Sequence, residues 1–189
     1  MSKIGIFGGT FNPPHIGHLI MANEVLHALD LAEVRFMPNA IPPHKAQPND
    51  ATSAQRLHLT ELAIEGNEHF MIEPYEIEQG GISYSYDTLA ALTKREPEHD
   101  FYFIIGGDQV DSLHSWYRIE ELLHFVTFVG VNRPGNKGIT SLPITHVEAP
   151  LIDLSSTLIR QRLATNQTVT YLLPEQVERF IREEGLYGT

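Results

Sequence analysis

Short apolar runs alternate along this chain with longer segments in which apolar residues recur every three or four positions. Short runs bounded by turn residues are typical of buried strands, and the periodic segments are typical of amphipathic helices. The pattern predicts strands at 4–7, 34–37, 70–72, 101–105, 125–131 and 144–147. It predicts helices from about His15 to Leu29, from a cap at Thr52 or Ser53 to a stop at Gly66, and from Ser83 to Lys94. Further helices are predicted after Gly106-Gly107-Asp108, after a cap at Ser155 or Ser156, and from near Pro174, which suits a first helical position.

Strands separated by helices of this length imply right-handed crossovers and a mainly parallel sheet. We therefore expect an α/β fold with one doubly wound, Rossmann-like domain over residues 1–189. Ligands of such sheets bind beyond the carboxyl ends of the strands. Gly8-Gly9, Gly106-Gly107-Asp108 and Arg133 each follow a predicted strand, so we expect them to share one edge of the sheet.

Composition narrows the function classes. The 189 residues carry a net charge of −11, from 13 basic and 24 acidic side chains, without a basic face or tail of the kind that binds nucleic acid. The chain has no cysteine and no apolar run of about 18 residues, so we expect no disulfide, no thiol chemistry and no membrane span. A cytoplasmic enzyme fits these features; the oligomeric state stays open, and a homo-oligomer is compatible with them.

The first strand-to-helix junction carries the densest chemistry. Gly8 and Gly9 follow the strand, where we expect the backbone to turn, and two prolines lead into the next helix. The helix N-terminus favours an anion, above all a phosphate. His15 and His18 are three residues apart, so they should share a helix face toward that phosphate, and Gly17 should leave room for it. The plainer alternatives are a simple turn for the two glycines and a surface or helix-capping role for the histidines.

The segment His15-Ile16-Gly17-His18 resembles the (H/T)-x-G-H signature of the nucleotidyltransferase superfamily, which class I aminoacyl-tRNA synthetases share. A second segment, Leu154 to Arg160, resembles the S-S-T-x-I-R motif by which small adenylyltransferases bind the triphosphate of ATP. Ile104 to Asp108 is similar to their I-I-G-x-D element. The K-M-S-K-S string of the synthetases is absent, which favours a small adenylyltransferase.

From Ile4 to about Tyr187 the chain resembles the bacterial nicotinate-nucleotide adenylyltransferases. The pair Trp116-Tyr117 matches the family's aromatic pair beside the pyridine ring. The stretch Ser83 to Thr88 matches its S-Y-(T/S)-(Y/F)-D-T element, with Ser85 where threonine is common. Ile41 to Lys45 matches a P-x-x-K loop.

The resemblance implies transfer of AMP from ATP to nicotinate mononucleotide, with His15 and His18 as the catalytic pair and Mg²⁺ carried with ATP. The implied ATP-binding residues are Gly8, Gly9, Thr10, Phe11, His15, His18, Gly106, Asp108, Arg133, Ser155, Ser156, Thr157 and Arg160. The implied mononucleotide-binding residues are Lys45, Ser85, Trp116 and Tyr117, and no metal site made by protein groups alone is expected.

Two other functions remain open at this stage. One is a different small nucleotidyltransferase, such as one acting on phosphopantetheine, and the other is a non-catalytic nucleotide sensor. Single residues also have plainer interpretations: Trp116 as a core anchor, Asp108 as a helix cap, and Lys45, Arg133 and Arg160 as surface cations.

Overall fold

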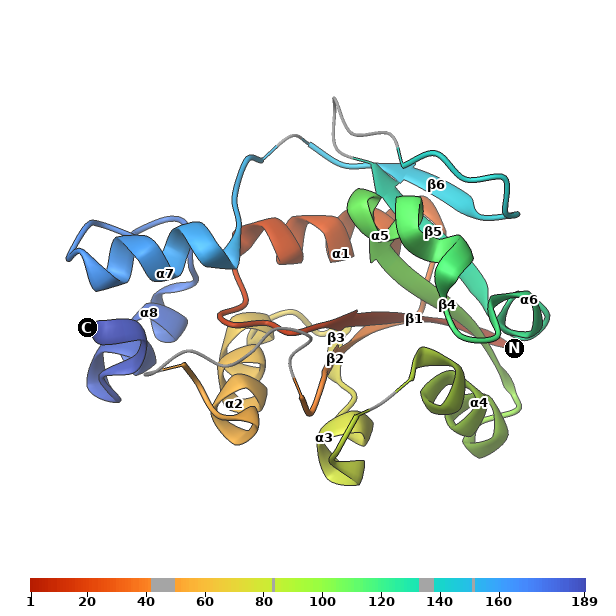
Figure 1. Cartoon of the computed structure of the whole chain (residues 1–189), viewed down its shortest axis with the longest axis horizontal. Helices are drawn as coiled ribbons and strands as arrows, with labels where there is room; N and C mark the ends of the chain where they lie inside the picture. Colours follow the sequence, from red (N-terminus) through yellow and green to blue (C-terminus); the bar gives the residue numbers. More distant parts are fainter. Residues whose placement is uncertain (42–49, 83, 133–137, 151) are drawn as a thin grey trace.

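A computed structural model of the chain describes residues 1–41, 50–82, 84–132, 138–150 and 152–189. Over these residues, six strands form one parallel sheet in the order β3-β2-β1-β4-β5-β6 (Figure 1). The strands are β1 (Ser2–Gly9), β2 (Glu33–Pro38), β3 (Phe70–Ile72), β4 (His99–Gly106), β5 (Thr127–Asn132) and β6 (Thr145–Glu148). The expected α/β class with a doubly wound parallel sheet is confirmed.

The helices follow the predicted alternation. They are α1 (Ile16–Ala28), α2 (Ser53–Ile64), α3 (Tyr75–Gln79), α4 (Ser85–Arg95), α5 (Gly107–Ser112), α6 (Ile119–Leu122), α7 (Ser156–Ala164) and α8 (Glu175–Glu183), with 3₁₀ turns η1 at Leu113–Ser115 and η2 at Leu186–Gly188. The hydrophobic pattern missed α3 and α6 because helices of 5 and 4 residues are too short to show a period. In none of the described ranges does a helix combine the length and apolar character needed to cross a bilayer.

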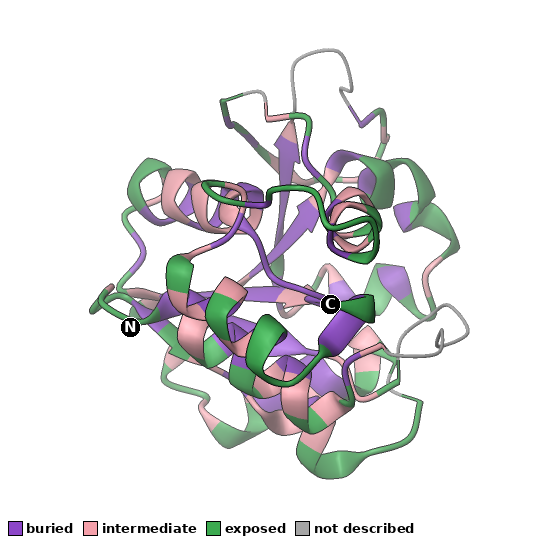
Figure 2. Ribbon diagram, turned by 90° about the vertical axis from the view of Figure 1, so that its left-hand side faces the viewer, coloured by how far each residue is buried: buried purple, intermediate pink, exposed green. Residues whose placement is uncertain are grey.

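Alternating residues of the strands face two separate layers of helices. In β1, Ile4 and Ile6 pack in a cluster with Leu89 and Leu92 of α4, whereas Phe7 points to the opposite face and packs with α1. The strands are therefore buried between helices that expose their outer sides (Figure 2). This arrangement explains why the strands read as nearly continuous apolar runs.

A third apolar cluster lies beside the sheet and joins the C-terminal part of the chain to α2. Its buried members come from α2, α7, α8 and η2: Leu59, Ala63, Ile159, Leu163, Val177, Ile181, Leu186 and Tyr187. This cluster holds the start of α7 near the carboxyl end of β1, so its packing decides whether the two predicted nucleotide motifs meet.

Several predicted boundaries were wrong for local reasons. Phe125 and Val126 belong to the turn that closes α6, where their main-chain N–H groups donate to the carbonyl of Leu122, so β5 begins only at Thr127. Pro174 is the N-cap of α8, with an extended backbone, and not its first helical residue. Lys45, Ser83 and Arg133 lie outside the described residues.

Candidate active site at the carboxyl edge of the sheet

The loop after β1 lies where the strand order reverses. β1 pairs with β2 on one side and with β4 on the other, and the connections from these strands leave the sheet in opposite directions. A doubly wound sheet binds its ligands in the crevice at this point. The carboxyl ends of β1 and β4 are Gly9 and Gly106, so two of the predicted glycine elements do meet at one edge.

Gly8 and Gly9 do not form the turn that the sequence suggested. Both are the last residues of β1, in register with Met37 and Pro38 of β2. The chain turns at Phe11, whose φ of 50° lies in the left-handed region. Glycine is required at position 9 by packing, because a Cβ there would lie 2.9 Å from the Phe11 ring.

The two histidines lie together, but by a different geometry from the one expected. His15 is the N-cap of α1 with an extended backbone, so the two residues do not share a helix face. Their rings stack with centroids 3.7 Å apart, and the His15 main-chain N–H donates to Nδ1 of His18 at 3.1 Å. The room provided by Gly17 is filled by the His15 ring itself, 3.0 Å from where a Cβ would be.

The hydrogen bond to Nδ1 fixes the tautomer of His18. Since Nδ1 accepts a hydrogen bond, the proton of the neutral ring resides on Nε2 and makes that atom a donor. Phe11 packs edge-on against the ring at 5.1 Å, and the stacked His15 is 2% exposed. His18 is thus a positioned hydrogen-bond donor of the kind that a phosphate oxygen requires.

The serine-rich start of α7 contacts the same loop. Ser156 Oγ donates to the carbonyl of Pro13 at 2.8 Å, and Arg160 donates to the carbonyl of Asn12, also at 2.8 Å. Ser155 is the N-cap and accepts from the N–H of Leu158. Two segments more than 140 residues apart therefore form one surface, as the sequence motifs predicted.

These contacts limit which groups of α7 can bind a phosphate, because some of its side chains already bind the loop. The Ser156 hydroxyl is committed to a loop carbonyl, and Arg160 also donates to Thr157 Oγ1 at 3.3 Å and lies 4.0 Å from Asp50. The first-turn N–H groups of a helix have no intrahelical acceptor, so those of Ser156 and Thr157 are the natural anion donors here.

Sequence reasoning missed Arg56, which anchors the other side of the loop. This side chain of α2 is 1% exposed, and it donates to the carbonyls of Thr10 at 2.7 Å, Asn39 at 2.6 Å and Ala40 at 3.0 Å. Burial lowers the pKa of its guanidinium, which nevertheless stays a cation at neutral pH. A signal existed: Arg56 lies in helical register with buried Leu59 and Ala63.

A cavity of about 230 Å³ joins this loop to the predicted mononucleotide side. Gly8 and Gly9 line it together with Ser85, the first residue of α4, and Phe103 of β4. A Cβ on Gly8 would lie 3.2 Å from the Phe103 ring, so the glycine allows β1 and β4 to share this wall.

Trp116 packs beside Phe103, which lines this cavity. Its ring meets Phe103 and Phe128 edge-on, each at 6.1 Å, and the side chain is half-buried. The core-anchor interpretation is therefore correct for part of the ring. Tyr117 is 54% exposed and lies 5.3 Å from Tyr84.

Asp108 has neither the position nor the contacts of a helix cap. Gly106 is the N-cap of α5, and Asp108 stands exposed in the first turn of that helix. Asp108 follows the carboxyl end of β4, at the same edge of the sheet as Gly9.

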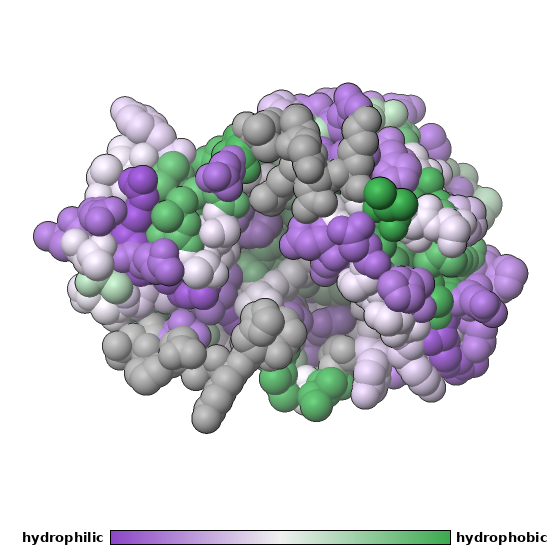
Figure 3. All heavy atoms as spheres, turned by 45° about the horizontal axis from the view of Figure 1, so that its top comes forward, coloured by the Kyte–Doolittle hydropathy of each residue, from purple (hydrophilic) through white to green (hydrophobic). Residues whose placement is uncertain are grey.

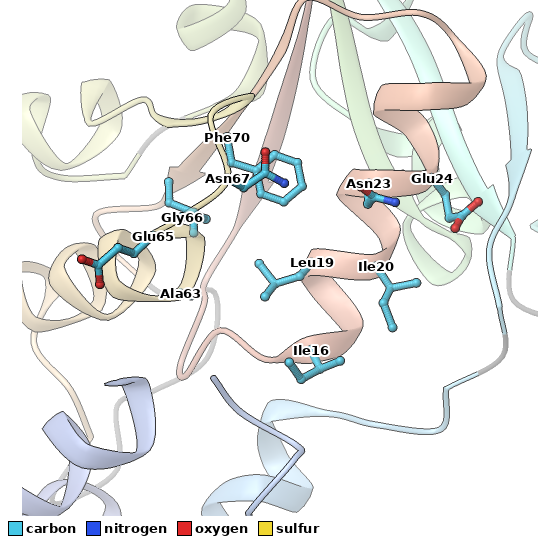
Figure 4. A pocket seen from close by; sticks show the side chains of 11 residues that line it. Ile16, Leu19, Ile20, Asn23, Glu24, Ala63, Glu65, Gly66, Asn67 and Phe70 are labelled. Carbon is cyan, nitrogen blue, oxygen red and sulfur yellow. The ribbon is translucent and has the colours of Figure 1, made fainter. Parts of the chain in front are cut away.

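Other hollows lie away from the predicted residues. A groove of about 490 Å³ between α1 and α2 is lined by Ile16, Leu19, Ile20, Phe70 and their neighbours (Figure 4). Its lining is mainly apolar and includes none of the predicted phosphate-binding side chains. On the face drawn in Figure 3, the described hydrophobic side chains lie in separate groups among hydrophilic ones.

Comparison with known proteins places these features in a wider group. The family model for cytidylyltransferase-like proteins matches residues 6–162. A protein of Geobacillus thermodenitrificans, assigned as a nicotinate-nucleotide adenylyltransferase, is 54% identical over 188 residues, covering 100% of this chain and 87% of its own. A Bacillus cereus protein with the same assignment is 55% identical over 187 residues, covering 99% of each chain. Among solved structures, the nicotinic acid mononucleotide adenylyltransferase of Plasmodium falciparum, complexed with NaAD, superposes with a TM-score of 0.81 at 18% identity, covering 99% of this chain and 98% of its own.

Proposed function

This chain belongs to the nicotinate-nucleotide adenylyltransferase family, and we propose that the loop after β1 and the start of α7 together hold the ATP on which this nucleotidyltransferase acts. The reaction transfers AMP from ATP to nicotinate mononucleotide and yields nicotinate adenine dinucleotide and pyrophosphate, a step of NAD biosynthesis. The hydrogen bonds of Ser156 and Arg160 to residues 12 and 13 are the observation that carries the proposal.

The chemistry requires no protein nucleophile. An oxygen of the mononucleotide phosphate attacks the α-phosphorus of ATP, the bond from that phosphorus to the bridging oxygen breaks, and pyrophosphate leaves with its electron pair. Because the attacking group is already an anion, the protein has to supply position and charge stabilisation.

The two histidines would provide the charge stabilisation. Nε2 of His18 carries the proton in the neutral ring and would donate it in a hydrogen bond to a phosphate oxygen. The stacked His15 holds that ring in place.

The start of α7 would bind the β- and γ-phosphates. Its main-chain N–H groups at Ser156 and Thr157, the helix dipole and the Arg160 cation act together there. Ser155 and the Ser156 hydroxyl serve this site indirectly, by capping the helix and by tying it to Pro13. We also propose that Gly106 and Asp108 approach the adenosine, and that Thr10 and Phe11 shape the loop around the triphosphate.

The mononucleotide would lie along Phe103, Ser85 and the half-buried Trp116, with Tyr117 beside them. A flat pyridine ring can stack on the accessible part of the indole. Lys45 and Arg133 remain predictions for phosphate contacts, since both lie outside the described residues.

Magnesium enters this scheme as part of the substrate MgATP. Among the described residues no three histidine or acidic side chains are grouped as a metal site would require. Mg²⁺ commonly binds through phosphate oxygens and waters, so it would accompany the triphosphate. We propose ATP and nicotinate mononucleotide as the partners, with nucleic acid and membranes playing no part.

The test is pyrophosphate release by the purified protein with MgATP and one co-substrate at a time. We expect turnover with nicotinate mononucleotide and none with phosphopantetheine. Comparing the rates with nicotinate and nicotinamide mononucleotide measures the preference for the acid. Turnover of phosphopantetheine alone would replace the proposal by the other small-transferase function. If the protein binds ATP but releases no pyrophosphate with any co-substrate, the result would favour a nucleotide sensor.

A further inference from the structure

Asn12 receives hydrogen bonds from two side chains of the C-terminal part of the chain. Its main-chain carbonyl accepts from Arg160 at 2.8 Å, and its side-chain Oδ1 accepts from the Tyr187 hydroxyl at 2.6 Å. The next residue, Pro13, accepts from Ser156 at 2.8 Å. The loop between Gly9 and His15 is therefore fixed by α7 and also by η2.

Both partners of the hydrogen bond between Tyr187 and Asn12 are buried. Asn12 is 7% exposed and Tyr187 is 5% exposed, and the tyrosine backbone has a φ of 58°, in the left-handed region that a bulky residue seldom adopts. Burial raises the pKa of the Tyr187 phenol, so the hydroxyl stays protonated and donates. Three charged groups face it: Arg160, Asp50 and Arg56.

The position of this bond relative to the site gives it a role beyond packing. Asn12 lies between Phe11, where the chain turns against His18, and His15, whose ring stacks on His18. A shift of Asn12 would therefore move both neighbours of the proposed phosphate donor. The cavity beside Ser85 does not include Asn12 or Tyr187, so the mononucleotide side is not coupled to it in the same direct way.

We propose that Tyr187 is a positioning residue for ATP: its hydroxyl holds Asn12, and through it the loop that presents the imidazoles to the triphosphate. This inference rests on the proposed function, because it names a further residue of the same ATP site. Tyr187 itself contacts the loop and not the reacting atoms.

The experiment is Tyr187→Phe, which removes the hydroxyl and keeps the ring in the apolar cluster. We expect KM for ATP to rise about five-fold or more, the factor that corresponds to about one net buried hydrogen bond, while KM for nicotinate mononucleotide stays within two-fold. Tyr171→Phe is the matched control, because Tyr171 is 90% exposed, and it should change neither constant. Equal changes in both KM values, or none in either at a temperature where the variant is folded, would overturn the inference.

A second variant keeps the test decisive if Tyr187→Phe folds poorly. Asn12→Leu alone removes the acceptor and should raise KM for ATP with KM for nicotinate mononucleotide within two-fold, and an unchanged KM for ATP would overturn the inference. Where both single variants fold, the double variant closes a cycle. If the pair acts as one unit, the double variant raises KM for ATP no more than the stronger single variant does, whereas additive effects contradict the coupling. Failure of the proposed function would look different, since the unmodified protein would then release no pyrophosphate.

Discussion

Replacing the buried Arg56 by methionine should weaken the fold and loosen the loop after β1 together. The change keeps most of the side-chain volume, so it leaves little cavity, and it removes every donor of the guanidinium. Arg56 reaches from α2 to two loops, that after β1 at Thr10 and that after β2 at Asn39 and Ala40. Methionine can make none of these bonds.

The magnitude follows from the acceptors left behind. Three main-chain carbonyls of partly buried residues lose a charged donor. The lower part of the cost of an unsatisfied acceptor, about 1–1.5 kcal/mol each, gives about 3–5 kcal/mol. Methionine also avoids the cost of burying a cation, which offsets part of this loss. We therefore expect the free energy of unfolding to fall by about 3 kcal/mol, equivalent to about 6–12 °C in Tm for a chain of this size.

Urea unfolding of Arg56→Met against the unmodified protein measures this difference. Arg179→Met is the matched control: this arginine of α8 is 64% exposed at its side chain and pairs with Glu175 at 2.8 Å, so we expect a change below about 0.5 kcal/mol. KM for ATP should rise in Arg56→Met, because the carbonyl of Thr10 loses its anchor. A stability within about 1 kcal/mol of the unmodified protein would refute the reasoning, since the three carbonyls would then have found other donors.

Three further results are expected. His18→Ala should lower kcat in the pyrophosphate assay by about 100-fold or more, far more than it lowers Tm, because the ring that contacts Phe11 and His15 is only half-buried. A loss of kcat that merely follows the loss of folded protein would point to a structural role. Trp116→Ala should raise KM for nicotinate mononucleotide about 3–10-fold, because the pyridine ring would lose its stacking partner. If the variant is destabilised but its KM for the mononucleotide is unchanged, Trp116 is only a core residue. Hydrogen bonds from Arg35 and then Arg95 hold the pKa of Glu96 at about 2, below its ordinary value of 4.5, so the stability it contributes is present above that value and is lost as the pH falls toward 2. Glu96→Gln should flatten this part of the stability curve in acid titrations followed by circular dichroism, and an unchanged slope would contradict the assignment.

Features that depend on neighbouring residues could be predicted from the sequence. Ser155 caps α7 because a serine before a periodic segment satisfies the first N–H groups, and α2 begins with a capping box of Thr52 and Gln55. The parallel sheet followed from the alternation of apolar runs and helices. The contact between the loop after β1 and the start of α7 followed from two motifs and not from periodicity.

Features that depend on long-range contacts could not be predicted. Arg56 binds a carbonyl 46 residues away, and Tyr187 binds a side chain 175 residues away, so no local pattern identifies their partners. The displacement of His15 from the helix was also hidden. An N-cap and a first helical residue differ in backbone angles, and the letters His-x-Gly-His are the same in either case.

The bond between Asn12 and Tyr187 has a consequence for the order of events during synthesis. The first strand and its loop leave the ribosome early, yet the tyrosine that fixes the loop is translated 175 residues later. A growing chain can pair β1 with β2 well before it can lock this loop. The contact at Asn12 Oδ1 therefore forms late, and a chain interrupted before Tyr187 would keep the contacts of Arg56, Ser156 and Arg160 with this loop but would lack the one that completes them.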